Sequence, residues 1–388
     1  MMQRDWKMKL YRLTFLIIFI STSIFSCTSE KTEWQGTIEH EDGMKIIHNK
    51  SPVWGDYPKV ELVFFQKLGE LYSDDENYMF NKPWDVAEDS EGNIYIVDLG
   101  DSCVKKFSPE GEYLKTFGRQ GQGPGEFGQC RYIEIDKDDT IYIRDLMFDR
   151  IQVFNTDGEF SNTIPDIRFG KFRIINSNKF LVWGYNYNPA TPKSTTMTIT
   201  SFKNEVLNEF SKSTIYTLSD KEMEMYVSSG GNSVSFTSDK QDYIYLAYKS
   251  QNRIEKFDKN GKMLFKTDRT LNFKTGYEKK TEFTDIERTI KVTLPKFRHV
   301  SRAIQIDHKN RIWVLAHKSH ADDYDKVLAK DIYELEVYSN DGILLGKLLY
   351  PVEWEAGFTP ELKICGNRVY FLNALTSPEI YQYKIIEQ

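Results

Sequence analysis

The sequence predicts an all-β fold, a six-bladed β-propeller of four-stranded antiparallel blades in which an N-terminal strand closes the last blade. Three observations predict it: a sequence unit that repeats, a high share of aromatic residues, and an apolar strand near the N-terminus that has no neighbour to pair with. Aromatic residues make up 14% of the 388 residues, and aromatic side chains pack well on the pleated surface of a β-sheet.

The repeated unit is most regular in its first two copies. The segment Trp84–Asp98, WDVAEDSEGNIYIVD, returns as Tyr132–Asp145, YIEIDKDDTIYIRD, and the two Ile-Tyr-Ile triplets lie 47 residues apart (141 − 94). A period near about 40–45 residues is typical of WD40-type propeller blades. Each copy continues into a second segment whose turn ends in glycine, Gly111 and Gly158. Short alternating strands between turn residues predict four-stranded antiparallel blades.

Four further copies bring the number of blades to six. They cover residues 172–210, a degenerate copy, and residues 234–261, 303–342 and 362–386. The last copy supplies only three strands, whereas the apolar segment Val60–Leu68 has no strand beside it in the sequence. We therefore expect Val60–Leu68 to pair with the last copy, because closing the ring removes open sheet edges.

One segment interrupts the repeat between its fourth and fifth copies. Residues 268–298 fit no blade, and Phe283, Ile286 and Ile290 lie at near-helical spacing within Tyr277–Ile290. This spacing predicts an amphipathic helix that covers a face of the propeller or contacts a partner.

The connector Phe117–Phe127, FGRQGQGPGEF, is rich in glycine. It lacks the Lys-Ser/Thr of a P-loop and no helix pattern follows it, so the sequence disfavours a phosphate-binding loop. The repeats and this connector resemble NHL repeats, and the region from Val60 to Gln388 resembles the six-bladed β-propeller lipoproteins common in Bacteroidetes. That resemblance implies the propeller fold but no reaction, because the members of this family mostly lack an assigned activity.

The N-terminus is typical of a secreted lipoprotein. A basic start precedes the apolar run Leu13–Phe25, which is shorter than the roughly 20 residues that cross a bilayer and suits a signal peptide. Ile24-Phe25-Ser26-Cys27 resembles a lipobox, so residues 1–27 are expected to be a lipoprotein signal peptide with Cys27 as the lipidated residue; ordinary secretion is the alternative. We expect residues 28–55 to form a flexible tether and residues 56–388 to form the propeller. The predicted location is the cell envelope, as an outer-membrane lipoprotein on the periplasmic or the surface face.

The net charge and its distribution limit the classes of partner that we expect. The formal net charge is −6, and Lys and Arg are scattered along the chain, which disfavours nucleic acid. The expected partners are a membrane, through the lipid anchor, and a glycan, a peptide or an envelope protein.

Cys103, Cys130 and Cys365 are an odd number and thus a poor disulfide framework. Buried free thiols are expected, with a bridge between Cys103 and Cys130 as the alternative.

Propeller geometry predicts where a ligand would bind. The start of each first strand and the loop after each second strand return to the same face, around the mouth of the central channel. The candidate ligand-binding residues at these positions are Trp84, Asp98, Asp101, Arg131, Arg144, Asp145, Arg173, Tyr185, Tyr248, Arg298 and Asn373. Such a ring suits a polar ligand with an anionic portion, or a sugar stacked on Trp84 and Tyr185. Alternatively, these residues only form hydrogen bonds within loops and pack between blades.

A histidine cluster is the basis for an alternative function. His299, His317 and His320 fall in one predicted blade, and histidines can ligate zinc or similar ions. Some NHL-type lyases use a channel metal and some six-bladed lactonases use carboxylates, but those enzymes draw ligands from several blades. The favoured function is a binding module at the channel mouth without a cofactor. The alternative is a metal-dependent hydrolase or lyase, and no catalytic residue is assigned.

Overall fold

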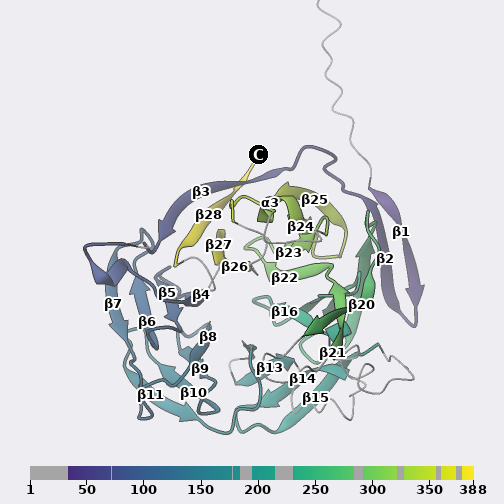
Figure 1. Cartoon of the computed structure of the whole chain (residues 1–388). Helices are drawn as coiled ribbons and strands as arrows, with labels where there is room; N and C mark the ends of the chain where they lie inside the picture. Colours follow the sequence, from purple (N-terminus) through teal and green to yellow (C-terminus); the bar gives the residue numbers. More distant parts are fainter. Residues whose placement is uncertain are drawn as a thin grey trace, which may run out of the picture. The chain divides into compact units, whose positions relative to one another are not determined.

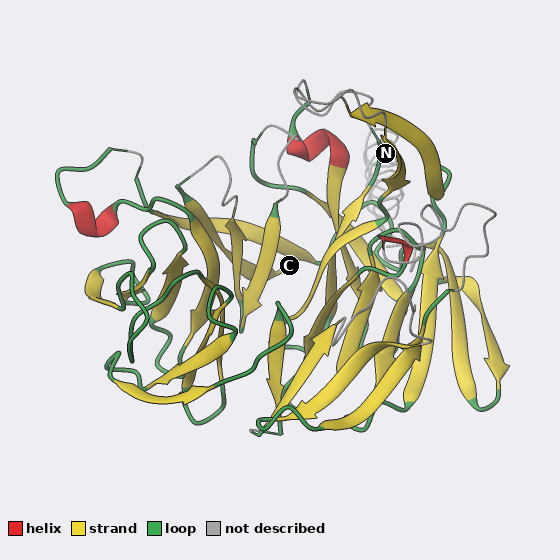
Figure 2. Cartoon of the chain, turned by 60° about the horizontal axis from the view of Figure 1, so that its bottom comes forward, coloured by secondary structure: helices red, strands yellow, loops and turns green. Residues whose placement is uncertain are grey.

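Six β-sheets are arranged around a common centre in the computed structural model of the chain (Figure 1). The structure describes residues 34–70, 72–176, 178–183, 195–214, 230–283, 292–320, 327–354, 360–372 and 378–388. The first strands of successive blades contact one another in ring order, and the first strand of blade six returns to that of blade one. Strands dominate, while the short helices η1 (Glu76–Tyr78) and α3 (Ala329–Ile332) lie outside the blades (Figure 2).

Each blade is a four-stranded antiparallel unit, as the repeat predicted. Blade one contains β4 (Pro83–Glu88), β5 (Ile94–Asp98), β6 (Cys103–Phe107) and β7 (Tyr113–Phe117); blade two contains β8 (Cys130–Ile135), β9 (Ile141–Asp145), β10 (Arg150–Phe154) and β11 (Phe160–Ile164); blade three contains β12 (Phe172–Ile175), β13 (Lys179–Trp183), β14 (Thr195–Ser201) and β15 (Val206–Lys212). Blade four contains β16 (Val234–Ser238), β17 (Ile244–Tyr248), β18 (Ile254–Phe257) and β19 (Met263–Arg269); blade five contains β22 (Ser301–Ile306), β23 (Ile312–His317), β24 (Tyr333–Tyr338) and β25 (Leu344–Leu349); blade six contains β26 (Glu361–Cys365), β27 (Arg368–Leu372), β28 (Ile380–Glu387) and β3 (Val60–Leu68).

Blade six confirms the predicted closure of the ring. The N-terminal β3 pairs antiparallel with the C-terminal β28, from Leu68 opposite Ile380 to Val60 opposite Glu387. Two segments more than 300 residues apart in the sequence thus share one sheet, because the fourth strand of the last blade would otherwise be missing.

The core lies between neighbouring blades. Between blades one and two, for example, Tyr95 and Val97 pack in one cluster with Ile133 and Phe154. The second strand of a blade is covered on both faces, and all five residues of β5 are buried. Such strands read in the sequence as continuous apolar runs, because neither face meets water.

The predicted flexible tether is wrong over residues 35–51. Strands β1 (Gln35–Glu41) and β2 (Met44–Ser51) form a hairpin, and β2 pairs parallel with β19, which widens the sheet of blade four to six strands. Ile47 is buried beside Phe265, and the Asn49 amide donates to Thr267 Oγ1 at 2.8 Å. One apolar pair in a polar segment carries too weak a period to predict this strand.

The predicted amphipathic helix is wrong where the structure describes it. Strands β20 (Gly276–Phe283) and β21 (Val292–Arg298) pair antiparallel as a separate two-stranded sheet. The Tyr277 and Phe297 rings are in contact, with 6.1 Å between their centroids and an angle of 51° between their planes. Cross-strand aromatic contacts of this kind stabilise a hairpin, and an apolar pattern this short does not distinguish helix from strand. Residues 284–290 lie outside the described residues.

The three described cysteines are free thiols, as expected. Cys103 and Cys130 are buried and Cys365 is half-buried. Burial raises the pKa of the Cys103 thiol to about 12, so it is a poor nucleophile at neutral pH. Among the described residues no helix is long and apolar enough to cross a membrane. Cys27 and the predicted signal peptide lie outside the described residues.

Candidate functional site

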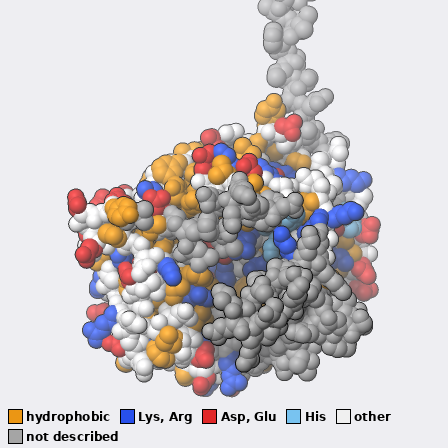
Figure 3. Space-filling view, viewed as in Figure 1, with side chains coloured by type: hydrophobic (Ala, Val, Ile, Leu, Met, Phe, Trp, Pro, Cys, Tyr) orange, Lys and Arg blue, Asp and Glu red, His pale blue; other side chains and the backbone are white. Residues whose placement is uncertain are grey.

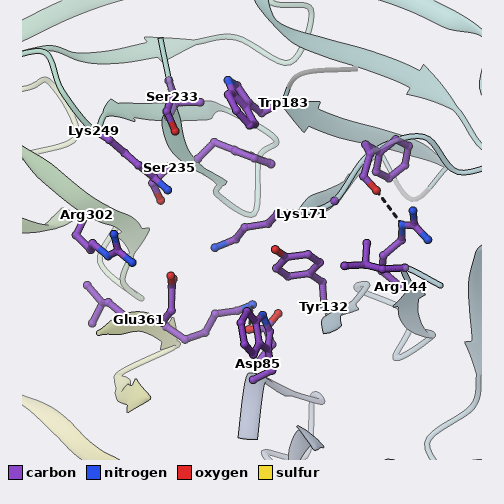
Figure 4. A pocket seen from close by; sticks show the side chains of 18 of the residues that line it. Asp85, Tyr132, Arg144, Lys171, Trp183, Ser233, Ser235, Lys249, Arg302 and Glu361 are labelled. Carbon is purple, nitrogen blue, oxygen red and sulfur yellow. Dashed lines mark hydrogen bonds and ion pairs between the residues drawn. The ribbon is translucent and has the colours of Figure 1, made fainter. Parts of the chain in front are cut away.

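A pocket of about 630 Å³ lies where the first strands of the blades converge, and every blade contributes to its lining. Figure 4 shows it from close by, and Figure 3 shows Lys and Arg side chains in the hollow at the centre of one face. A volume of this size is typical of small-molecule sites. The lining residues include Trp84 and Asp85 of blade one, Tyr132 and Arg144 of blade two, Lys171 and Trp183 of blade three, Ser233 and Lys249 of blade four, Arg302 of blade five, and Glu361 and Lys363 of blade six.

A β-bulge recurs at the second residue of the first strand in blades one, two and five. The register jumps across Trp84, Arg131 and Arg302, so each of these residues lacks a direct partner on the next strand. Bulges bend a strand and redirect a side chain. Trp84 and Arg302 line the pocket, and the Arg131 guanidinium lies over the Trp84 ring, 4.1 Å from its centroid.

The pocket has an excess of positive charge. Six of its lining residues are Lys or Arg and three are Asp or Glu. Two of these carboxylates have their own partners, because Asp85 pairs with Lys363 at 3.0 Å and Asp149 pairs with Arg144 at 2.9 Å. Glu361 is the third carboxylate, and it makes no ion pair within 4 Å among the residues that the structure describes.

Four cations of the lining remain without a carboxylate partner at ion-pair distance in the described part of the chain. Arg168 is exposed, whereas the other three, Lys171, Lys249 and Arg302, are half-buried. These three come from three consecutive blades, and in Figure 4 the side chains of Lys171 and Arg302 point toward one another and toward Glu361. The Arg302 Nε is buried and has no hydrogen-bond acceptor among the described atoms. A bound acceptor would satisfy this donor.

Two lysines of the pocket, half-buried Lys249 and buried Lys363, differ in their surroundings. Burial lowers the pKa of Lys249, and the nearby Arg302 and Lys171 lower it further, against the opposing field of Glu361. Burial would also lower the pKa of Lys363, but Asp85 and Glu134 outweigh it and raise that pKa above its usual value. The charge of Lys363 is thus already balanced by carboxylates of the fold. Lys249 lies near two other cations, so a bound negative charge beside it would stabilise its protonated form.

The predicted ring of ligand-binding residues is only partly brought together. Trp84 and Arg144 line the pocket, and Arg131 supports Trp84. Arg144 is nevertheless buried and donates to the backbone oxygens of Phe169 and Ile167. Tyr185 and Asn373 lie outside the described residues.

Asp98 and Asp145 have a framework role that the sequence pattern did not reveal. Asp145 is fully buried and accepts from the backbone N–H groups of Gly128 and Gln129, at 3.2 and 2.8 Å, and from Arg150. Asp98 holds the backbone of Asn81 and Lys82 in the same way, at 2.8 Å each. Each aspartate ties the chain that enters a blade to the end of its second strand, so these carboxylates are already satisfied.

Four other candidates lie away from the pocket lining. Tyr248 is fully buried beneath the Arg253 guanidinium, and Arg173 pairs with Glu134 at 2.8 Å. Asp101 accepts from the Asn81 amide at the surface, and Arg298 ends β21 of the separate hairpin.

The residues that the sequence analysis missed are Lys171, Lys249, Arg302, Trp183 and Glu361. One signal was present for Arg302: it precedes Ala-Ile-Gln-Ile as Arg131 precedes Tyr-Ile-Glu-Ile and Trp84 precedes Asp-Val-Ala. Aligning the copies on this strand finds all three bulge residues. The others lie in loops or at strand ends where the copies differ.

The three histidines of the predicted metal site lie close together. The rings of His317 and His320 stack at 5.2 Å between centroids, and His299 lies 6.0 Å from His317. Among the described residues no group of His, Cys, Asp or Glu has the arrangement of a metal centre. Burial, then the neighbouring histidines and Arg302, lowers the pKa of His317 to about 2, so this ring is neutral at neutral pH. Asp322 and Asp323, two carboxylates that follow His320 in the sequence, lie outside the described residues.

Comparisons with known proteins agree with this architecture. A family profile, DUF5128, described as a 6-bladed beta-propeller, matches residues 74–285, more than half of the chain. A solved member of the DUF4221 family from Bacteroides vulgatus is similar to this chain, with a TM-score of 0.55 and 13% sequence identity over 85% of this chain and 99% of that one. A solved protein of Bacteroides fragilis, described as exported, has a TM-score of 0.55 and 11% identity over 88% and 99%.

At these identities the two solved structures show a common fold alone. A search of curated proteins found no match. The resemblance to NHL repeats stays a prediction. The family profile, the six four-stranded sheets and their closure by β3 lead to one assignment. The chain belongs to the DUF5128 family of six-bladed β-propellers.

Proposed function

We propose that this propeller is a binding module of the cell envelope and that its ligand enters the central pocket with an anionic group. The observation that carries the proposal is the set of three half-buried cations, Lys171, Lys249 and Arg302, without carboxylate partners at ion-pair distance among the described residues. Like charges held together in a partly desolvated cavity disfavour one another. An anion would relieve this repulsion and accept hydrogen bonds from all three side chains.

The envelope location rests on two observations. The sequence Ile24–Cys27 resembles a lipobox, and the Bacteroides fragilis protein of similar fold is described as exported. We propose that Cys27 carries the lipid anchor. Replacing Cys27→Ser should abolish incorporation of labelled palmitate and release the protein from the membrane fraction. Labelling that persists in the variant would contradict the proposal.

Simple anions test the binding function. The purified protein is titrated with sodium citrate, phosphate and sulfate at constant ionic strength, and the melting temperature and the heat of binding are recorded. A ligand that binds only the folded state raises the melting temperature. We expect at least one anion to bind saturably, with affinity falling about tenfold in Lys249→Gln and in Arg302→Gln, since each variant loses a charge-assisted hydrogen bond.

The matched control is Lys259→Gln, which removes a lysine from an exposed turn of the same blade four. This control changes the net charge by the same amount and should bind like the wild type. If no anionic ligand binds saturably, or if the double variant Lys249→Gln/Arg302→Gln binds as well as the control, the proposed function is wrong.

A further inference from the structure

The pocket combines three kinds of lining groups that a simple anion would not use together. Besides the cations it presents two indole rings, Trp84 of blade one and Trp183 of blade three, and the Glu361 carboxylate. An acceptor such as Glu361 disfavours a neighbouring anion unless that anion also carries hydrogen-bond donors. The ligand must therefore offer donors and a negative charge within one molecule.

The indole rings are held in place before any ligand arrives. Trp183 donates its Nε1 hydrogen to the backbone oxygen of Asn232 at 3.3 Å, and the Arg131 guanidinium covers the Trp84 ring. Both side chains are half-buried and border the cavity. Fixed aromatic rings with few rotatable bonds offer contact area at low entropic cost, and their faces suit the C–H side of a pyranose ring.

Donors and acceptors for hydroxyl groups lie between the rings and the cations. Glu361 accepts no hydrogen bond from a described residue, and the Ser233 hydroxyl has no partner among them either. In Figure 4 the Glu361 carboxylate points into the same space as the Lys171 and Arg302 side chains. Vicinal hydroxyls would satisfy Glu361 while a carboxylate a few bonds away meets the cations.

We propose that the ligand is an acidic sugar, a uronic acid or a short oligomer of uronic acids, with its carboxylate on Lys171, Lys249 and Arg302, its hydroxyls on Glu361 and Ser233, and its ring against Trp183. This inference rests on the function proposed above and names the class of its ligand. The cavity of about 630 Å³ lies within the range of sites that enclose small molecules.

The test compares ligands that differ by one feature. Glucuronate and digalacturonate are titrated by calorimetry and by tryptophan fluorescence, alongside glucose, which lacks the carboxylate, citrate, which lacks the ring, and adenosine monophosphate, which combines a charge with an aromatic base. We expect a uronate to bind at least about tenfold more tightly than glucose and than citrate, because each comparison removes charge-assisted or stacking contacts.

Glu361→Gln separates recognition from structural damage, because two ligands should respond in opposite directions. The variant removes a negative charge, so citrate and phosphate should bind several-fold more tightly, while the uronates lose their strongest hydroxyl acceptor and bind about tenfold more weakly. Trp183→Leu should weaken uronate binding and leave citrate unchanged, and Trp183→Phe should restore most of it. The melting temperature of each variant confirms that it folds.

The possible outcomes distinguish failure of the sugar inference from failure of the anion-binding function. If citrate or phosphate binds as tightly as the uronates and Trp183→Leu changes neither, the sugar inference is overturned and the anion-binding function stands. Tighter binding of adenosine monophosphate would also overturn the inference, in favour of a nucleotide. Failure of every anion to bind would overturn both proposals.

Discussion

Trp313 donates its indole hydrogen to Asp307 Oδ2 at 2.8 Å, six residues back in the chain. Tyr95, Tyr142 and Tyr245 donate their hydroxyl hydrogens to Asp89, Asp136 and Asp239 over the same separation, at 3.0, 3.1 and 2.7 Å. In each case the other carboxylate oxygen accepts from the backbone of the turn between the first and second strands. One aspartate thus fixes both the turn and the strand that follows, in four of the six blades.

Removing this hydroxyl should weaken blade four without changing its packing. Tyr245→Phe takes one donor from a buried carboxylate and should lower the free energy of unfolding by about 1–2 kcal/mol, measured by urea denaturation. Asp239→Ala should cost more, because the N–H groups of Gln241 and Tyr243 also lose their acceptor. The control is Tyr243→Phe, because Tyr243 directly precedes the same strand and its hydroxyl makes no hydrogen bond to a described residue. Equal losses in Tyr245→Phe and Tyr243→Phe would contradict the assigned role.

This pairing explains why the fold was readable from the sequence. The Asp and the aromatic residue recur six positions apart because both are needed to turn the chain, so they mark the blades even where other residues differ. The closing strand Val60–Leu68 was predictable for two reasons. It is an apolar strand with no partner beside it in the sequence, and the last blade lacks a fourth strand. The hairpin of β1 and β2 was not predictable, since its pairing with β19 rests on Ile47 and Asn49 rather than on a period.

The pocket residues were harder to predict than the blades, because they do not belong to the repeated pattern. Lys171 and Lys249 lie just outside strands, where copies of the repeat share no residue type, and a propeller constrains backbone positions there but not side chains. Asp98 and Asp145, by contrast, recur at the same position of blades one and two, and the sequence pattern predicts a ligand-binding role for them. Their recurrence reflects the backbone groups that both blades must satisfy.

Asp145→Ala should therefore act on stability. The substitution leaves the N–H groups of Gly128 and Gln129 and the Arg150 guanidinium without their buried acceptor, which should cost about 3 kcal/mol or more. Asp138→Ala, an exposed aspartate of the same blade, should change the free energy of unfolding by less than about 0.5 kcal/mol. Similar stabilities of the two variants in chemical denaturation would show that the buried contacts contribute little.

Leu68→Ala tests the closure of the ring. Leu68 on β3 is buried in the cluster between blades six and one, with Phe80 and Val86. Truncating a buried leucine should cost about 2–5 kcal/mol, whereas Val63→Ala on the same strand removes a side chain that is 43% exposed and should cost far less. Melting temperatures of both variants measure the difference. A Leu68→Ala protein as stable as Val63→Ala would mean that β3 is not held by the core.

His317 should make the protein sensitive to acid. Burial and its cationic neighbours lower the pKa of His317 to about 2, so the folded state keeps this histidine neutral while the unfolded state protonates it near pH 6.5. The stability that His317 contributes is complete above pH 6.5 and falls by about 1.4 kcal/mol per pH unit below it. His317→Leu should remove this loss between pH 6.5 and 5, measured as urea midpoints across that range. Parallel profiles for the variant and the wild type would show that folded His317 takes up a proton.

Glu88 should act in the opposite direction over part of the same range. Burial raises the pKa of Glu88 to about 7, although the Tyr370 hydroxyl and Arg368, 2.8 Å away, lower it in part. A carboxyl group that binds its proton more tightly in the folded state contributes stability that is complete below pH 4.5 and is lost as the pH rises through 7.

Between about pH 5 and 6.5 the two groups oppose each other, because raising the pH restores the stability that depends on neutral His317 and removes the stability that depends on protonated Glu88. We expect Glu88→Gln to gain stability more steeply than the wild type as the pH rises, and His317→Leu to lose stability over the same interval. Urea midpoints of the two single variants and the double variant, at half-unit steps of pH, measure both slopes. A Glu88→Gln profile parallel to the wild type would mean that Arg368 keeps folded Glu88 ionised throughout.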